Sequence, residues 1–79
     1  MTVRTYIHLD VRPTEPKDRF ETIMGAYQSL PAGGTMVLVV DHDPRCMYYT
    51  LQATEGDETF RFDYLEDGPE VWRVEVTRS

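Results

Sequence analysis

The stretch from Val37 to Tyr49, VLVVDHDPRCMYY, constrains the fold of this chain more than any other part. Its apolar, β-branched beginning is typical of a buried strand, and the polar triplet at 41–43 ends that strand. Pro44 then favours a helix, because proline is well accepted in a first helical turn. The pattern therefore predicts a buried strand at 35–40 that leads into a helix at 44–53. Ligands in α/β sheets most often lie at the carboxyl ends of strands, so this corner is the first place to look for function.

Patterns on either side of this stretch complete a two-layer architecture. Residues 3–11, 60–64 and 72–76 alternate with a period of two, which predicts three further strands, with 65–70 as the loop between the last two. A helix should begin at Pro16. Its apolar stripe consists of Phe20, Ile23, Met24, Tyr27 and Leu30. We therefore expect an α/β fold, specifically an α+β two-layer sandwich of order β-α-β-α-β-β, in which two helices cover one face of a four-stranded mixed sheet.

Composition narrows the classes of function. With 79 residues and one cysteine, we expect a single domain at 1–79 without a disulfide framework, which fits a cytoplasmic location. Neither a signal peptide nor a membrane span is predicted, because charged residues interrupt the apolar runs. The net charge of -6 repels phosphate backbones, so a nucleic acid partner is not expected, whereas a basic protein surface or a cation would suit the chain.

Charged and titratable side chains gather at the predicted strand-end corner. The group consists of Asp10, Arg12, Glu15, Asp41, His42 and Asp43. Carboxylates and an imidazole could bind a divalent metal here. Alternatively, Asp43 before Pro44 is an ordinary helix N-cap, and Asp41 can pair with Arg12. Because the D-H-D spacing is no known metal signature, capping and ion pairing are favoured, and no cofactor is expected.

Cys46 is the only thiol of the chain and lies in the first turn of the second predicted helix. Amide dipoles and the neighbouring Arg45 could make it reactive. The alternative is a small core residue, since free cysteine is often buried. The sequence favours the core position and predicts no catalytic residue.

The face of the sheet that the helices leave open is a third candidate. It should carry Tyr6, His8 and Arg73, together with Arg4, Arg61, Asp63, Val71 and Glu75, around Val37 and Val39 or their neighbours. Such a face could be a docking surface or a homodimer interface. The alternative is a solvated face with cross-strand ion pairs such as Arg61 with Glu75. Trp72 is expected in the core, because it shares a face with Val74 and Val76.

Several motifs resemble one bacterial family. LDVRP at 9–13, DHDP at 41–44, Tyr48-Tyr49 and above all YLEDGPEVWRVEV at 64–76 are similar to the family named only as domain of unknown function 2249. That family resembles the TusA/SirA sulfur-carrier fold. The resemblance implies a TusA/SirA-like sandwich and a bacterial cytoplasmic protein, sometimes fused or adjacent to hemerythrin-like and nitrogen-oxide-related proteins. It implies no established activity.

The start of the first helix separates this chain from the sulfur carriers it resembles. Those carriers hold a persulfide on a Cys-Pro pair there, whereas this chain has Glu15-Pro16, and a carboxylate cannot carry sulfane sulfur. The resemblance therefore favours a noncatalytic interaction or accessory module in redox, sulfur or nitrogen-oxide metabolism, with a protein partner and a monomeric or homodimeric state. The alternative is a sulfur- or metal-handling protein that uses Cys46 or the Asp41-His42-Asp43 corner.

Overall fold

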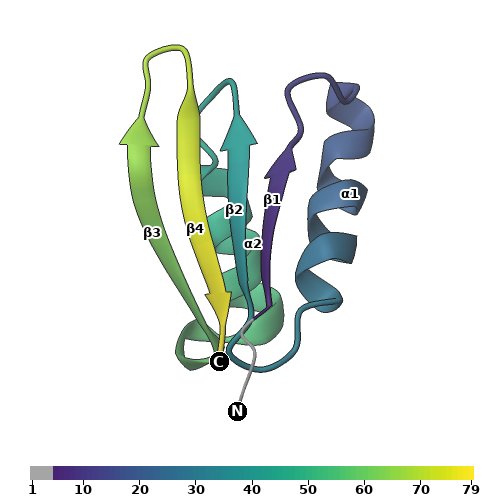
Figure 1. Ribbon diagram of the computed structural model, residues 1–79, viewed down its shortest axis with the longest axis vertical. Helices are drawn as coiled ribbons and strands as arrows, with labels where there is room; N and C mark the ends of the chain where they lie inside the picture. Colours follow the sequence, from purple (N-terminus) through teal and green to yellow (C-terminus); the bar gives the residue numbers. More distant parts are fainter. Residues whose placement is uncertain (1–4) are drawn as a thin grey trace.

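The computed structural model describes residues 5–79, and its elements follow the predicted order. They are β1 (Tyr6–Asp10), α1 (Pro16–Gln28), β2 (Thr35–Val40), α2 (Arg45–Glu55), the short 3₁₀ helix η1 (Asp57–Thr59), β3 (Phe60–Asp67) and β4 (Trp72–Arg78). The strands form one sheet in the order β1-β2-β4-β3, with β1 parallel to β2 and β4 antiparallel to both neighbours (Figure 1). The predicted α+β sandwich is confirmed. No helix in the described range is long and apolar enough to cross a membrane.

The core lies between the helices and one face of the sheet. Its cluster consists of Val11, Ile23, Tyr27, Leu30, Met36, Leu38, Val40, Met47, Leu51, Phe60, Val74 and Val76. Both helices contribute to this one cluster, so both cover the same face, as predicted. Full burial of an aliphatic or aromatic side chain of this size contributes about 1.5–3 kcal/mol to folding. Trp72 packs against the cluster, which confirms the face on which it was expected.

On the opposite face of the sheet, the central residues of β2 are buried although no helix covers them. Val37 and Val39 alternate with the core residues of β2 and therefore point away from the helices, yet they are only 3% and 1% exposed. The strand register places His8 and Glu75 on either side of Val37. Because such neighbours cover the valines, burial of the central strand does not require a second chain on this face.

Ion pairs on the open face differ from the predicted one. Asp63 lies opposite Glu75, so Arg61 does not face Glu75 in the register. Arg61 instead approaches Asp63 of its own strand to 4.0 Å, and Arg73 donates a hydrogen bond to Glu66 at 3.1 Å. The predicted pair of Arg61 with Glu75 is wrong, because alternation identifies a face of the sheet but does not fix the register between strands.

The strand β3 is longer than predicted. It continues to Asp67, into the segment expected as a loop, and it carries a register irregularity between Tyr64 and Glu66. Such a β-bulge adds one residue to a strand without ending the pairing. Leu65 at the bulge is 55% exposed. The alternation breaks here because of the bulge, not because the strand stops.

The N-terminal half of the fold also departs from two expectations. In the described range the first strand begins at Tyr6, while Val3 and Arg4 lie outside the described residues. The helix α1 begins at Pro16, as predicted, but Phe20 of its apolar stripe is 51% exposed. Phe20 forms a wall of an open hollow instead of joining the core.

Candidate functional site

The predicted strand-end corner forms, but its charged side chains do not converge on one point. Arg12 Nη2 donates to Asp10 Oδ2 at 2.6 Å. Asp41 pairs with Arg19, whose Nη1 donates to Asp41 Oδ1 at 2.9 Å, and His42 Nδ1 lies 2.9 Å from the same oxygen. The predicted pair of Arg12 with Asp41 is therefore wrong. Arg12 bonds instead with Asp10, two residues before it, and Asp41 pairs with Arg19 of α1.

Arg19 is a structural residue of this corner that the sequence analysis missed. Its side chain is only 12% exposed. Nε donates to the carbonyl of Thr14 at 2.9 Å, and Nη2 donates to the carbonyl of Arg12 at 3.0 Å. With the bond to Asp41, these contacts join α1 to the segment after β1 and to the end of β2. Nothing local in the sequence pointed to a contact between Arg19 and Asp41.

The ion pairs lower the pKa of two carboxyl groups. Hydrogen bonds from Arg12 lower the pKa of Asp10 from 3.8 to about 2. Hydrogen bonds from Arg19 and then from His42 lower the pKa of Asp41 from 3.8 to about 2. Both groups therefore remain ionised near neutral pH, and they serve as ion-pair partners and not as proton donors.

Replacing Arg19 by methionine is expected to raise the pKa of Asp41 from about 2 toward 3.8, because the largest cause of its depression is removed. NMR titration of the side-chain carboxyl carbons measures this directly. A carboxyl with a depressed pKa stabilises the fold above about pH 4, and that contribution is lost as the pH falls toward 2. The thermal midpoint of the variant should therefore change less across this window than that of the wild type.

Replacing Arg12 by methionine is the matched control for that titration. Here the pKa of Asp10 should rise while that of Asp41 stays near 2, since Asp10 depends first on Arg12. If both carboxyls shifted equally in either variant, the two ion pairs would be one coupled network, contrary to the geometry.

Asp43 turns away from the other two carboxylates and toward β3. Its Oδ1 accepts from the backbone N–H of Arg45, the first residue of α2, at 3.1 Å, and from the hydroxyl of Tyr64 at 2.6 Å. Asp43 was predicted as the N-cap of α2, but Pro44 holds that position, so Asp43 lies one residue before the N-cap and bonds the first amide of the helix. The guanidinium of Arg45 lies 3.3 Å from Asp43 Oδ2. Among residues 5–79, no three His, Cys, Asp or Glu side chains come together in a way that could hold a metal ion.

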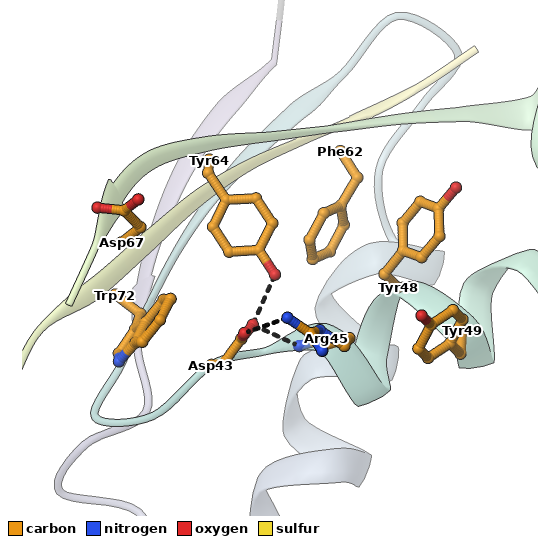
Figure 2. A pocket seen from close by; sticks show the side chains of 8 residues that line it. All are labelled: Asp43, Arg45, Tyr48, Tyr49, Phe62, Tyr64, Asp67 and Trp72. Atoms are coloured by element: carbon orange, nitrogen blue, oxygen red, sulfur yellow. Dashed lines mark hydrogen bonds and ion pairs between the residues drawn. The ribbon is translucent and has the colours of Figure 1, made fainter. Parts of the chain in front are cut away.

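An open hollow of about 620 Å³ lies beside Asp43, between α2 and the hairpin of β3 and β4. Figure 2 shows the side chains that line it: Asp43, Arg45, Tyr48, Tyr49, Phe62, Tyr64, Asp67 and Trp72. We call this the aromatic hollow. Its volume falls within the range of about 300–1,000 Å³ that is usual for ligand sites. Its lining includes Asp43, which follows β2, and Asp67, which ends β3. The aromatic hollow therefore extends to the end of the sheet at which β1, β2 and β3 all terminate (Figure 1), as does the strand-end corner.

Five rings form a continuous row through the aromatic hollow. In order they are Tyr49, Tyr48, Phe62, Tyr64 and Trp72, with centroid separations of 5.6, 5.4, 5.7 and 6.2 Å and edge-to-face geometry throughout. Each such contact contributes about 0.5–1.5 kcal/mol beyond burial of area, so the row holds its own shape. Tyr49 and Tyr64 remain 57% and 44% exposed. Exposed apolar surface that is gathered in one place is a common feature of interaction sites.

The charges of the aromatic hollow do not cancel. Asp43 is compensated by Arg45, whereas the exposed carboxylate of Asp67 has no ion-pair partner among residues 5–79. Burial and then the hydrogen bond to Asp43 raise the pKa of Tyr64 to about 12, so its phenol stays neutral and donates. The lining therefore has a net negative charge at neutral pH.

Cys46 does not occupy the core position that the sequence favoured. It is exposed, because Met47 and Leu51 take the buried positions of α2. Cys46 lines a second hollow, of about 240 Å³, together with Phe20 of α1. The prediction failed because the phase of a short helix is hard to set when apolar residues are adjacent in sequence.

The remaining predicted residues lie apart from the aromatic hollow. Glu15 is exposed at the N-cap position of α1, and its side chain makes no capping hydrogen bond. Tyr6 and His8 are exposed on β1, and Arg73 bonds Glu66 across the hairpin. The structure therefore divides the predicted set among four surfaces: the strand-end corner, the aromatic hollow with Asp43, the second hollow and the open face of the sheet.

Fold and site together define a small two-layer α+β domain with an aromatic hollow at one end of its sheet. The chain belongs to the family described as Uncharacterized conserved protein (DUF2249), whose model matches residues 8–78. That range includes the corner and every residue of the aromatic hollow, and it confirms the family that the motifs predicted. The chain matches no curated protein and no solved structure.

Proposed function

We propose that this domain is a noncatalytic interaction or accessory module that binds a partner protein through the aromatic hollow. The row of five rings carries the proposal, because Tyr49 and Tyr64 stay largely exposed beside a hollow large enough for a side chain. Rigid aromatic side chains supply much of the binding energy at protein interfaces. The strand-end corner lies at the same end of the sheet and provides a charged border for the same partner.

The start of α1 supports a role that works by contact. In a TusA/SirA-like protein this position would carry the sulfur, but here Glu15 precedes Pro16 and is exposed to solvent. A carboxylate offers no nucleophile for sulfur transfer. We therefore place the domain as an accessory protein in the cytoplasm, in redox, sulfur or nitrogen-oxide metabolism, as its resemblance to the sulfur carriers suggests.

Site-specific photo-crosslinking in the native host tests this proposal. A photoreactive residue at Tyr49 is expected to yield one defined protein adduct, because Tyr49 is 57% exposed in the aromatic hollow. The same residue at Glu21, exposed on α1 and outside the hollow, is the matched control and should give none. Equal adducts from both positions, or none from Tyr49, would contradict a partner at this surface.

A second candidate function, sulfur handling, draws on the exposure of Cys46 beside the second hollow. Alkylation kinetics separate the two candidates. Under our proposal Cys46 reacts no faster than free cysteine at neutral pH, and intact mass shows no added sulfur. A reaction at least tenfold faster, or a stable persulfide, would favour sulfur handling.

Thermal midpoints measured with iron, zinc and copper test the metal alternative in parallel, since a ligand of the folded state raises the midpoint.

A further inference from the structure

We infer that the aromatic hollow binds a basic side chain, lysine or arginine, from a segment of the partner protein. This inference rests on the proposed function, because it names the chemistry of the partner that the hollow accepts. Two features of the described residues, the row of rings and the uncompensated carboxylate, support it, and so does the net charge of the full sequence.

The rings favour a cation. A lysine or arginine head group within about 6 Å of a tyrosine or tryptophan ring is attracted by the negative face of that ring, more strongly where water is excluded. In the aromatic hollow, Tyr49, Tyr64 and Trp72 belong to one row whose edge-to-face contacts hold the rings in place. Rings oriented in advance lose little conformational freedom when a ligand binds.

The carboxylates favour the same charge. Asp67 lies in the lining with Trp72 and has no ion-pair partner among residues 5–79, so it can receive a cationic head group without breaking an existing pair. Among the described residues that line the hollow, Arg45 is the one cation, and it already pairs with Asp43 at 3.3 Å. An anionic ligand would have to break that pair and approach Asp67.

The charge of the whole chain extends this preference beyond the hollow. A net charge of -6 attracts basic partners and repels acidic ones at distances within the screening length of the solution. Glu70, in the loop between β3 and β4, is also exposed and adds a further negative charge at this end of the hairpin. A basic segment therefore meets complementary charge before its side chain reaches the rings.

Peptide titration followed by NMR tests the inference on the full chain. The probe is a capped five-residue peptide with one lysine between glycines, and the matched peptides carry arginine, norleucine or glutamate at that place. The lysine and arginine peptides are expected to shift the indole N–H signal of Trp72 in a saturable manner and to bind at least fivefold more tightly than the norleucine peptide. The glutamate peptide should give no saturable shift.

Variants of the chain assign the effect to the hollow. Replacing Tyr49 by leucine keeps every charge but removes a ring face, so binding of the lysine peptide should weaken by about two- to tenfold. Replacing Asp67 by asparagine should weaken binding of the lysine peptide by about threefold. Replacing Glu21 by glutamine, an equal change of charge on α1 and outside the lining, should change that binding by no more than about 1.5-fold. Replacing Tyr64 by phenylalanine keeps the ring and should preserve binding.

The outcomes distinguish this inference from the proposed function. If crosslinks form from Tyr49 but the norleucine or glutamate peptide binds as well as the lysine peptide, the hollow is an interface of different chemistry and this inference is wrong. If the Asp67 and Glu21 variants weaken binding equally, and the Tyr49 variant does not weaken it, the attraction is only that of net charge, which also overturns the inference. A hundredfold preference for tetramethylammonium over the lysine peptide would assign the hollow to a small cation instead of a protein segment.

Discussion

Replacing Leu38 by alanine is expected to lower the free energy of unfolding by about 3–4 kcal/mol, the usual cost when a fully buried leucine leaves a cavity that cannot collapse. Leu38 has no exposed surface and lies in the middle of β2, the strand that pairs with both β1 and β4. A domain of this size has a stability of about 4–12 kcal/mol, so the loss could approach the whole of it. Urea denaturation followed by circular dichroism measures the change.

The matched control is the same substitution at Leu65. Leu65 is 55% exposed at the bulge of β3, so replacing it by alanine should change the stability by no more than about 0.5 kcal/mol. If the two variants lost similar amounts, the assignment of faces along β2 and β3 would be wrong. A variant of Leu38 that unfolds before denaturant is added still agrees with the prediction, provided that the Leu65 variant remains folded.

The central strand shows why the architecture could be predicted from the sequence. Five consecutive apolar residues from Met36 to Val40, mostly β-branched and bounded by turn residues, are typical of a strand buried on both sides. Pro16 is the first residue of α1, and Pro44 is the N-cap of α2. These signals are local and strong. The bulge after Tyr64 was not predictable, because an extra residue in a strand looks like the end of alternation when the partner strand is unknown.

The candidate site was harder to predict because it is assembled from distant segments. Asp43 was predicted as the N-cap of α2, but it lies one residue before the N-cap, and its bond from Tyr64 joins residues that lie 21 positions apart. The rings of Phe62, Tyr64 and Trp72 alternate toward the helix side, and alternation alone assigns such residues to the core. They line an open hollow because α2 leaves part of β3 uncovered, and the extent of that cover depends on packing. An unusual density of aromatic residues at 48–49 and 60–72 was the only available signal.

Arginine placement could not be predicted for a related reason. The sequence offered Arg12 as the partner of Asp41, since both follow adjacent parallel strands. In the structure Arg12 bonds Asp10, two residues away. Asp41 is bonded instead by Arg19, which lies near the start of α1. Long, flexible side chains reach several partners of similar energy, so backbone topology alone does not choose between them.

Replacing Gly68 by alanine is expected to lower the free energy of unfolding by about 2–4 kcal/mol, from two separate causes. A Cβ at this position would lie 2.7 Å from Cε2 and Cζ2 of Trp72, which is closer than real Cβ atoms approach other heavy atoms. Gly68 also has a φ of 89°, a conformation that alanine adopts only with strain. Because Trp72 is the only tryptophan, its fluorescence spectrum reports any displacement of the ring directly.

Replacing Gly33 by alanine separates those two causes and connects Gly68 to binding. Gly33 has a similar φ of 83°, but a Cβ there would meet nothing within 4 Å, so this variant should lose only the strain, about 1–2 kcal/mol, and keep the fluorescence of Trp72 unchanged. The difference in stability loss between the two variants measures the cost of the collision with Trp72.

Since the ring of Trp72 is a wall of the aromatic hollow, the Gly68 variant should also bind the lysine peptide more weakly, while the Gly33 variant should bind it normally. Equal stability losses and an unmoved tryptophan in both would show that Gly68 does not hold the hollow in shape.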